Sequence, residues 1–194
     1  MLIAIIAFTV ALPSQAIEKP ATVDPVVCAV DVEAQMVRPW QDYEFSHQTP
    51  GGPMWLAGRG CFLSAADVSR AYLARGPLLG VREQAITQLH LARYLAYGGD
   101  EVAAAQAAAS ARRSDQRTGQ EIPLDWNSYV QGLYAFLVKD RPLLDANLER
   151  LRASPNQGDA VNGRNLAALS SCFNRSYYEA MTDATCWAPE TPAP

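Results

Sequence analysis

The side chains of this chain that could do acid–base or nucleophilic chemistry are few, and its two histidines, His47 and His90, come first. An imidazole acts as a general acid or base when a carboxylate or a nucleophile lies within hydrogen-bond reach. No Gly-x-Ser-x-Gly elbow, phosphate-binding glycine loop or His-Glu-x-x-His helix accompanies the two histidines. The sequence therefore predicts no enzyme, no catalytic residue and no cofactor.

Four cysteines are the other reactive side chains: Cys28, Cys61, Cys172 and Cys186. An even number of cysteines in an exported chain favours disulfides. Metal binding is the competing interpretation, but no two cysteines have the spacing of a zinc knuckle, and neither histidine lies near one in sequence. The sequence predicts no metal site and leaves three disulfide connectivities open. We expect sequence-near pairing, Cys28 with Cys61 and Cys172 with Cys186.

The charged residues argue against a nucleic-acid partner. The net charge is −4, and the sixteen Lys and Arg residues are scattered, with no run longer than Arg112-Arg113. Phosphate contacts require clustered basic side chains. With 49% hydrophobic and 19% charged residues, the composition is that of a folded globular protein.

Residues 1–16 have the character of a secretory signal peptide. They carry no charge, and an apolar run from Leu2 to Leu12 precedes the small residues Ser14 and Ala16. This run is shorter than the roughly 20 residues that span a bilayer, so we expect cleavage after Ala16 and no stable membrane insertion afterwards. A buried N-terminal helix is the alternative. The Ala-rich composition suggests a bacterial source and thus a periplasmic or extracellular location.

The clearest structural signal is a helical hairpin over residues 82–113. Ala85, Leu89, Ala92 and Ala96 recur at helical spacing before Gly98-Gly99-Asp100, and Ala104, Ala108 and Ala111 recur after it. The glycines can end the first helix, and the Asp100 carboxylate can cap the second. The sequence therefore predicts two antiparallel helices packed through small alanine faces.

Further helices are expected on both sides of this hairpin. Before it we expect a short helix over residues 28–38, with Val30, Ala34 and Val37 on one face, and a helix from a capping box at Ser64 to Arg75. Residues 39–55 contain three prolines and four large aromatic side chains, which indicates a loop covering the first hairpin, or alternatively an aromatic binding loop around His47. After it we expect helices from Asp125 to Val138, from Pro142 to Ser154, from Arg164 to Cys172, and from a capping box at Ser176, with a loop over residues 156–163.

The caps of the second helices repeat along the chain. Ser64, Asp100, Asp140 and Ser176 are separated by 36, 40 and 36 residues, a period typical of helical-hairpin repeats. With Leu91-Ala92, Gly99-Asp100, Ala104 and Ala111, the central unit resembles the tetratricopeptide-repeat family. Gln88 and Gln116 depart from that family's pattern, and Gly60-Cys61-Phe62 is a second candidate for the first turn. The resemblance implies an all-α superhelix of stacked antiparallel hairpins with about eight or nine helices; an ordinary helical bundle is the alternative.

These signals divide the chain into four parts. Residues 1–16 are expected to be the signal peptide, residues 17–52 an N-terminal helix and aromatic loop, residues 53–187 the repeat domain, and residues 188–194 a disordered tail.

The resemblance also implies a binding groove lined by the first helix of each pair, which would receive a peptide or a partner helix. The side chains expected there are His90, Arg93, Tyr97, Asn127, Gln131, Tyr134 and Arg164, and the arginines can bind a peptide carboxylate through paired N–H donors. We therefore expect a non-enzymatic interaction or scaffold module with a protein or peptide partner. A small envelope hydrolase that uses His47 or His90 in an aromatic-lined cleft is the alternative, and a purely structural subunit is a third.

Overall fold

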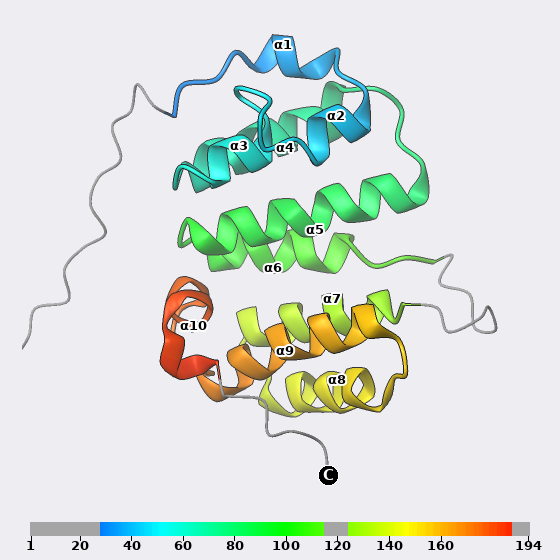
Figure 1. Cartoon of the computed structure of the whole chain (residues 1–194), viewed down its shortest axis with the longest axis vertical. Coiled ribbons are helices and arrows are strands. Elements are labelled where there is room, and N and C mark those ends of the chain that lie inside the picture. Colours follow the sequence, from blue (N-terminus) through cyan, green and yellow to red (C-terminus); the bar gives the residue numbers. More distant parts are fainter. Residues whose placement is uncertain (1–27, 115–123, 188–194) are drawn as a thin grey trace, which may run out of the picture.

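Helices form every regular element in the described part of the chain, residues 28–114 and 124–187 of the computed structural model. The all-α prediction is confirmed. Figure 1 shows the helices stacked along the long axis of the molecule, with each long helix packed against the one that follows it. The first six are α1 (Val32–Met36), α2 (Trp40–Glu44), α3 (Pro53–Ala57), α4 (Phe62–Arg75), α5 (Val81–Tyr97) and α6 (Glu101–Ser110). The others are α7 (Trp126–Leu137), α8 (Arg141–Ala153), α9 (Gln157–Ser171), α10 (Tyr177–Thr182) and a 3-10 turn, η1 (Ala184–Cys186).

The hairpin of α5 and α6 forms as predicted. Gly99 has a φ of +87°, the left-handed conformation that only glycine adopts without strain. The Asp100 carboxylate accepts from the Ala103 N–H at 3.0 Å and so satisfies a free donor at the start of α6. Ala92, Ala104 and Ala108 are fully buried, because these small side chains let the two helices approach closely.

Local capping also defines the helices of the second half. The carboxylates of Asp125 and Asp140 accept from backbone N–H groups at the starts of α7 and α8. Lys139, with a φ of 58°, turns the chain between these helices. Its ammonium donates to the backbone carbonyls of Phe173 and Arg175 and thereby ties this turn to the one before α10. Burial lowers the pKa of Lys139.

Two boundary predictions in the N-terminal half are wrong. Helix α4 begins at Phe62 after Gly60, whose φ is +77°, so Ser64 lies inside the helix and caps nothing. Residues 39–55 are not simply a loop, because they contain α2 and most of α3. Proline explains this difference: Pro39 and Pro53 stand at helix starts, where a fixed φ is favourable and the missing N–H costs little.

The predicted face of the first helix is also wrong. Helix α1 begins after Asp31, whose carboxylate accepts from the Ala34 N–H at 3.1 Å. The helix is therefore shorter than expected and buries Gln35 and Met36, whereas Val37 is 82% exposed.

Helix α9 begins seven residues before the predicted start at Arg164. The Asn156 side chain accepts from the Gly158 N–H at 2.8 Å and provides an N-terminal cap. Asp159 in the first turn is fully buried, and its carboxylate accepts from the Asp125 N–H and from the Ser154 hydroxyl. The polar residues that suggested a loop therefore supply the hydrogen bonds at the start of α9.

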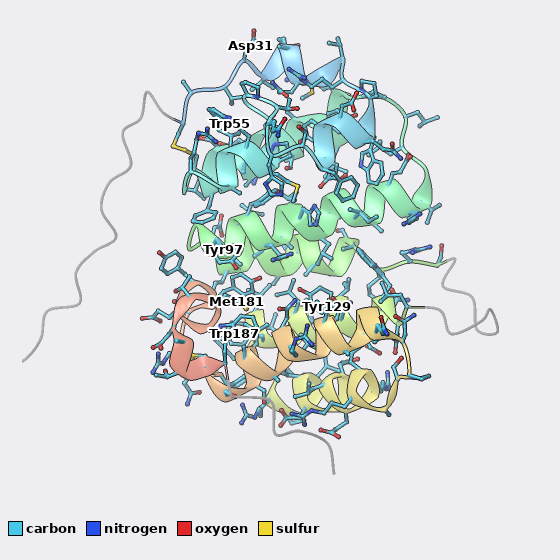
Figure 2. The ribbon with its side chains drawn as sticks, in the orientation of Figure 1. Asp31, Trp55, Tyr97, Tyr129, Met181 and Trp187 are labelled. Atoms are coloured by element: carbon cyan, nitrogen blue, oxygen red, sulfur yellow. A yellow bond between two sulfur atoms is a disulfide. The ribbon has the colours of Figure 1, made fainter. Side chains whose placement is uncertain are left out.

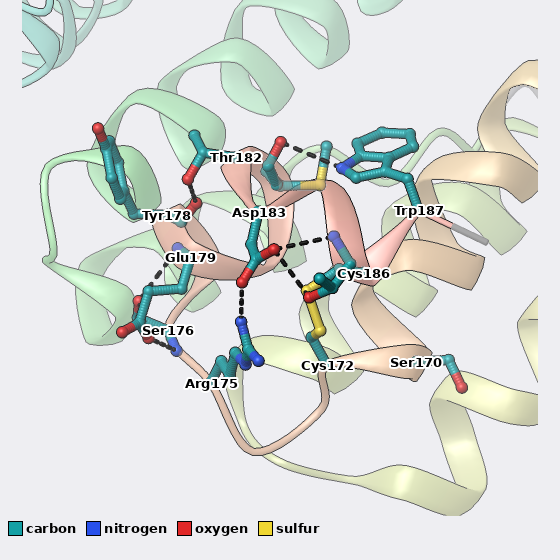
Figure 3. The surroundings of a disulfide bond; sticks show 12 residues. Ser170, Cys172, Arg175, Ser176, Tyr178, Glu179, Thr182, Asp183, Cys186 and Trp187 are labelled. Atoms are coloured by element: carbon teal, nitrogen blue, oxygen red, sulfur yellow. Dashed lines mark hydrogen bonds and ion pairs between the residues drawn. A yellow bond between two sulfur atoms is a disulfide. The ribbon is translucent and has the colours of Figure 1, made fainter. Parts of the chain in front are cut away.

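Two disulfides join the expected cysteine pairs, Cys28 with Cys61 and Cys172 with Cys186. The second bridge is possible because α10 is only six residues long and η1 returns the chain to the end of α9 (Figure 3). The predicted capping box at Ser176 and Glu179 is present. The Thr185 N–H and hydroxyl, together with Arg175, lower the pKa of Asp183 to about 2.

The predicted signal peptide at residues 1–16 and the predicted tail at residues 188–194 lie outside the described residues. Within residues 28–114 and 124–187, no helix combines the length and the apolar character needed to cross a membrane.

Candidate functional site

A buried carboxylate joins α2 to α5. Glu44, on α2, is fully buried, and its two oxygens contact side chains of α5. The Thr87 hydroxyl donates to Oε2 at 2.7 Å, and Nδ1 of His90 lies 2.5 Å from Oε1. The Trp40 indole N–H in turn donates to the Thr87 hydroxyl oxygen at 2.9 Å. A carboxylate out of water is costly unless hydrogen bonds compensate it, and this network supplies them.

Aromatic side chains hold α2 in the position that makes the network possible. The Tyr43 ring stacks on the Tyr72 ring of α4 with centroids 3.7 Å apart. The Tyr72 hydroxyl donates to the Arg38 carbonyl at 2.8 Å, just before α2. Burial raises the pKa of Tyr72 to about 12, and the Glu44 charge adds to this effect. The short helix is therefore anchored to α4 just before its start and at the residue next to Glu44.

The hydrogen-bonding direction determines how His90 is presented. An ionised carboxylate only accepts hydrogen bonds, so opposite an ionised Glu44 the Nδ1 of His90 is the donor. The other ring nitrogen, Nε2, is left to act as an acceptor in the neutral imidazole or as a donor in the imidazolium. The His90 side chain is 17% exposed, so it is accessible from the pocket described next.

His90 lines a pocket of about 180 Å³ between α3 and α5. Met54 and Ala57 of α3, the following Gly58, and Phe62 of α4 form one part of its wall. The residues of α5 that line it are His90, Arg93, Tyr94 and Tyr97. The exposed His47 completes the lining. We call this cavity the His90 pocket.

Arg93 gives the His90 pocket a positive charge. Tyr129 of α7 and Tyr177 of α10 raise the pKa of Arg93 above the usual range, and Tyr177 also makes a hydrogen bond with its side chain. Its Nε is buried without a hydrogen-bond partner. Within the described residues, no carboxylate lies within ion-pair distance of Arg93. Arg93 is therefore a partly buried cation whose charge an anionic ligand could match.

Burial also affects Tyr177 and Tyr94, two tyrosines close to Arg93. Burial raises the pKa of Tyr177, an effect that the neighbouring Arg93 charge reduces. Burial also raises the pKa of Tyr94, and the Glu44 charge adds to the rise. Tyr97 lies at the end of α5 closest to α10, where its ring packs edge-on against the Tyr177 ring at 4.9 Å (Figure 2). Tyr94 and Tyr177 are therefore neutral near neutral pH and supply no negative charge to Arg93.

The predicted binding residues do not lie in one groove. His90, Arg93 and Tyr97 share the His90 pocket. Gln131 and Tyr134 line a second pocket of about 250 Å³ together with Ala108, Ala109 and Arg112 of the α6 region, Val130 of α7 and Leu143 of α8. We call this cavity the Arg112 pocket.

Asn127 and Arg164 line neither pocket. The Asn127 amide exchanges two hydrogen bonds of 2.9 Å with the Arg113 backbone, which gives it a structural position at the start of α7. Arg164 is exposed on α9.

Sequence reasoning missed Glu44, and nothing local could have identified it. Glu44 lies in a stretch whose prolines predicted a loop, and its partners lie more than forty residues away in the sequence. Thr87 and Tyr94 did carry a signal, because they share one face of α5 with His90 at steps of three and four residues.

No three His, Cys, Asp or Glu side chains gather as a metal site in the described part of the chain. Comparison of the chain with protein-family models, with curated proteins and with solved structures finds no match.

Proposed function

We propose that this chain is an exported, non-enzymatic interaction module with a tetratricopeptide-like arrangement, and that the His90 pocket binds an anionic group of its protein or peptide partner. The observation that carries the proposal is Arg93, a partly buried cation that lines the pocket without a carboxylate partner among the described residues and whose Nε is buried without a hydrogen bond. Isolated buried charges destabilise a fold, so a ligand that supplies the opposite charge would gain a strong interaction there.

Two further features support the proposal. Both disulfides favour an oxidising compartment, the periplasm or the cell exterior. The stacked hairpins α5–α6 and α7–α8 are the kind of framework on which a partner surface is built. The charged group of a partner would approach past His47 and Gly58, which are both exposed at the pocket.

Site-directed photo-crosslinking in the native envelope tests the proposal. A photoreactive residue in place of Met54 should capture one specific partner, whereas the same residue in place of Gln131, in the Arg112 pocket, should not. Arg93→Gln should abolish the capture and Arg112→Gln should leave it intact, with circular dichroism confirming the fold of each variant. Capture that persists in Arg93→Gln would contradict the proposal.

A small hydrolase is the second candidate, and the short Glu44–His90 contact favours it. A carboxylate that orients an imidazole is the arrangement of a general base. Among the described residues that line the His90 pocket there is no Ser, Thr or Cys. The nucleophile would therefore be water. A panel of ester and amide substrates decides between the candidates: turnover that His90→Gln removes, without loss of fold, supports the hydrolase, and a complete lack of turnover leaves the interaction module.

A further inference from the structure

We infer that the His90 pocket recognises one carboxylate held within two carbons of an aromatic ring, a chemistry found both in free aromatic acids such as phenylacetate and in peptides that end in Phe, Tyr or Trp. This inference rests on the proposed function and specifies the anionic ligand. It follows from three properties of the pocket: its division into polar and apolar parts, its charge and its size.

The lining of the His90 pocket is divided by chemistry. Arg93 and His90 are polar residues of the lining, whereas Met54, Ala57 and Phe62 are apolar. Phe62 and Tyr97 stack with centroids 4.9 Å apart and an interplanar angle of 19°. This aromatic pair presents a flat apolar surface beside the charged groups. A ligand with one anionic group and an apolar body matches both parts.

The charge around the pocket selects a monoanion. Nδ1 of His90 lies 2.5 Å from the Glu44 carboxylate, so a positive charge on His90 would be matched there. Arg93 is then the one positive charge among Glu44, His90 and Arg93 that has no carboxylate partner in the described part of the chain. A carboxylate therefore fits better than a phosphate dianion, and a guanidinium matches the planar carboxylate geometry.

The size of the pocket selects a single ring. A dry protein cavity of about 150 Å³ accepts one benzene molecule, and the His90 pocket has a volume of about 180 Å³. Phe62 and Tyr97 can pack against the ring of the ligand in the offset or edge-on geometries that aromatic pairs prefer. Met54 adds a thioether, which makes favourable contacts with aromatic rings.

Calorimetric titration of the disulfide-intact protein tests this inference with defined probes. Phenylacetate should bind, and phenylacetamide, hexanoate and phenyl phosphate should each bind at least tenfold more weakly. Arg93→Gln should remove the preference for the acid over the amide, whereas Arg112→Gln should preserve it. Ala57→Leu, which fills the apolar part and keeps Arg93, should weaken phenylacetate binding at least tenfold. Melting curves establish that each variant is folded.

Peptide probes distinguish the two sources of the ligand. A tetrapeptide that ends in Phe, compared with its C-terminal amide, shows whether the pocket recognises the C-terminal carboxylate of a peptide. Tighter binding of the peptide acid than of phenylacetate assigns the site to a protein C-terminus, and the reverse order assigns it to a free aromatic acid.

The inference is overturned if acid and amide bind equally, if hexanoate binds as well as phenylacetate, or if no probe binds. A peptide without a C-terminal aromatic residue that binds equally well in an Arg93-dependent manner would also overturn it. That last result would not contradict the proposed interaction module, which the photo-crosslinking experiment tests separately.

Discussion

The two pockets of this molecule differ in how their polar side chains are held. In the His90 pocket, a buried carboxylate fixes His90, and Thr87 and Trp40 fix the carboxylate. In the Arg112 pocket, by contrast, the described residues provide no hydrogen bond or ion pair to the Arg112, Gln131 or Tyr134 side chains. The Arg112 pocket is nevertheless the larger one, at about 250 Å³ against about 180 Å³. Volume alone is therefore a poor guide to which pocket binds a ligand, because affinity depends on polar groups that are ordered before the ligand arrives.

The largest expected effect concerns the buried carboxylate. Glu44→Ala leaves His90 and Thr87 without their partner, so we expect a loss of about 3–5 kcal/mol in the free energy of unfolding, as is usual for breaking a buried pair. Asp67→Ala is the matched control, because it removes an exposed partner of Arg70 and should cost at most about 1 kcal/mol. Urea unfolding measures both variants. Equal losses would show that the network does not stabilise the region around the His90 pocket.

The disulfides should have the next largest effect, and they act at the same pocket. The Cys28–Cys61 bridge precedes Phe62, and the Cys172–Cys186 bridge holds the chain after α10, which carries Tyr177. With sequence separations of 33 and 14 residues, loop entropy assigns them about 4 and about 3 kcal/mol of stability.

Paired Cys→Ser variants measure these contributions in urea. Hydrogen exchange should accelerate in α4 for the first pair and in α10 for the second, with α8 unaffected in both. Faster exchange in α8 would mean that the bridges stabilise the whole stack rather than the surroundings of the His90 pocket.

The part of the fold that could be predicted from the sequence is the part fixed by neighbouring residues. Asp100, Asp125, Asp140 and Ser176 cap helices as expected, because a capping side chain and its N–H partner lie within three residues. Where prolines begin short helices, as at Pro39 and Pro53, their usual role as breakers was misleading.

The candidate site could be predicted only in part, for a related reason. His90, Arg93 and Tyr97 were identifiable because they lie on one helix. The partner of His90, Glu44, comes from a different helix through a tertiary contact that no local pattern encodes. The grouping of Gln131 with Arg112 was missed because the sequence does not reveal which side of α7 faces α6.

A smaller effect is expected beneath the Arg112 pocket. A Cβ at Gly132 on α7 would lie 2.3 Å from Cδ1 of Leu166, which is fully buried on α9 and has no room to move. We expect Gly132→Ala to cost about 1–3 kcal/mol through overpacking. Gly98→Ala is the control, since its Cβ would meet Leu63, whose side chain is 51% exposed and free to rotate away. Thermal unfolding that ranks Gly98→Ala as the more damaging change would contradict this reasoning.

The smallest effect should come from the Arg112 pocket itself. Arg112 is exposed and Gln131 is half-buried, and neither makes a hydrogen bond within the described residues. We therefore expect Arg112→Ala and Gln131→Ala to change the free energy of unfolding by no more than about 0.5 kcal/mol. Neither change should alter binding of an anion at the His90 pocket, because neither residue contributes to that lining. If Arg112→Ala weakened anion binding as much as Arg93→Gln, the two pockets would form one extended site, and the contrast between an ordered and an unordered pocket would no longer hold.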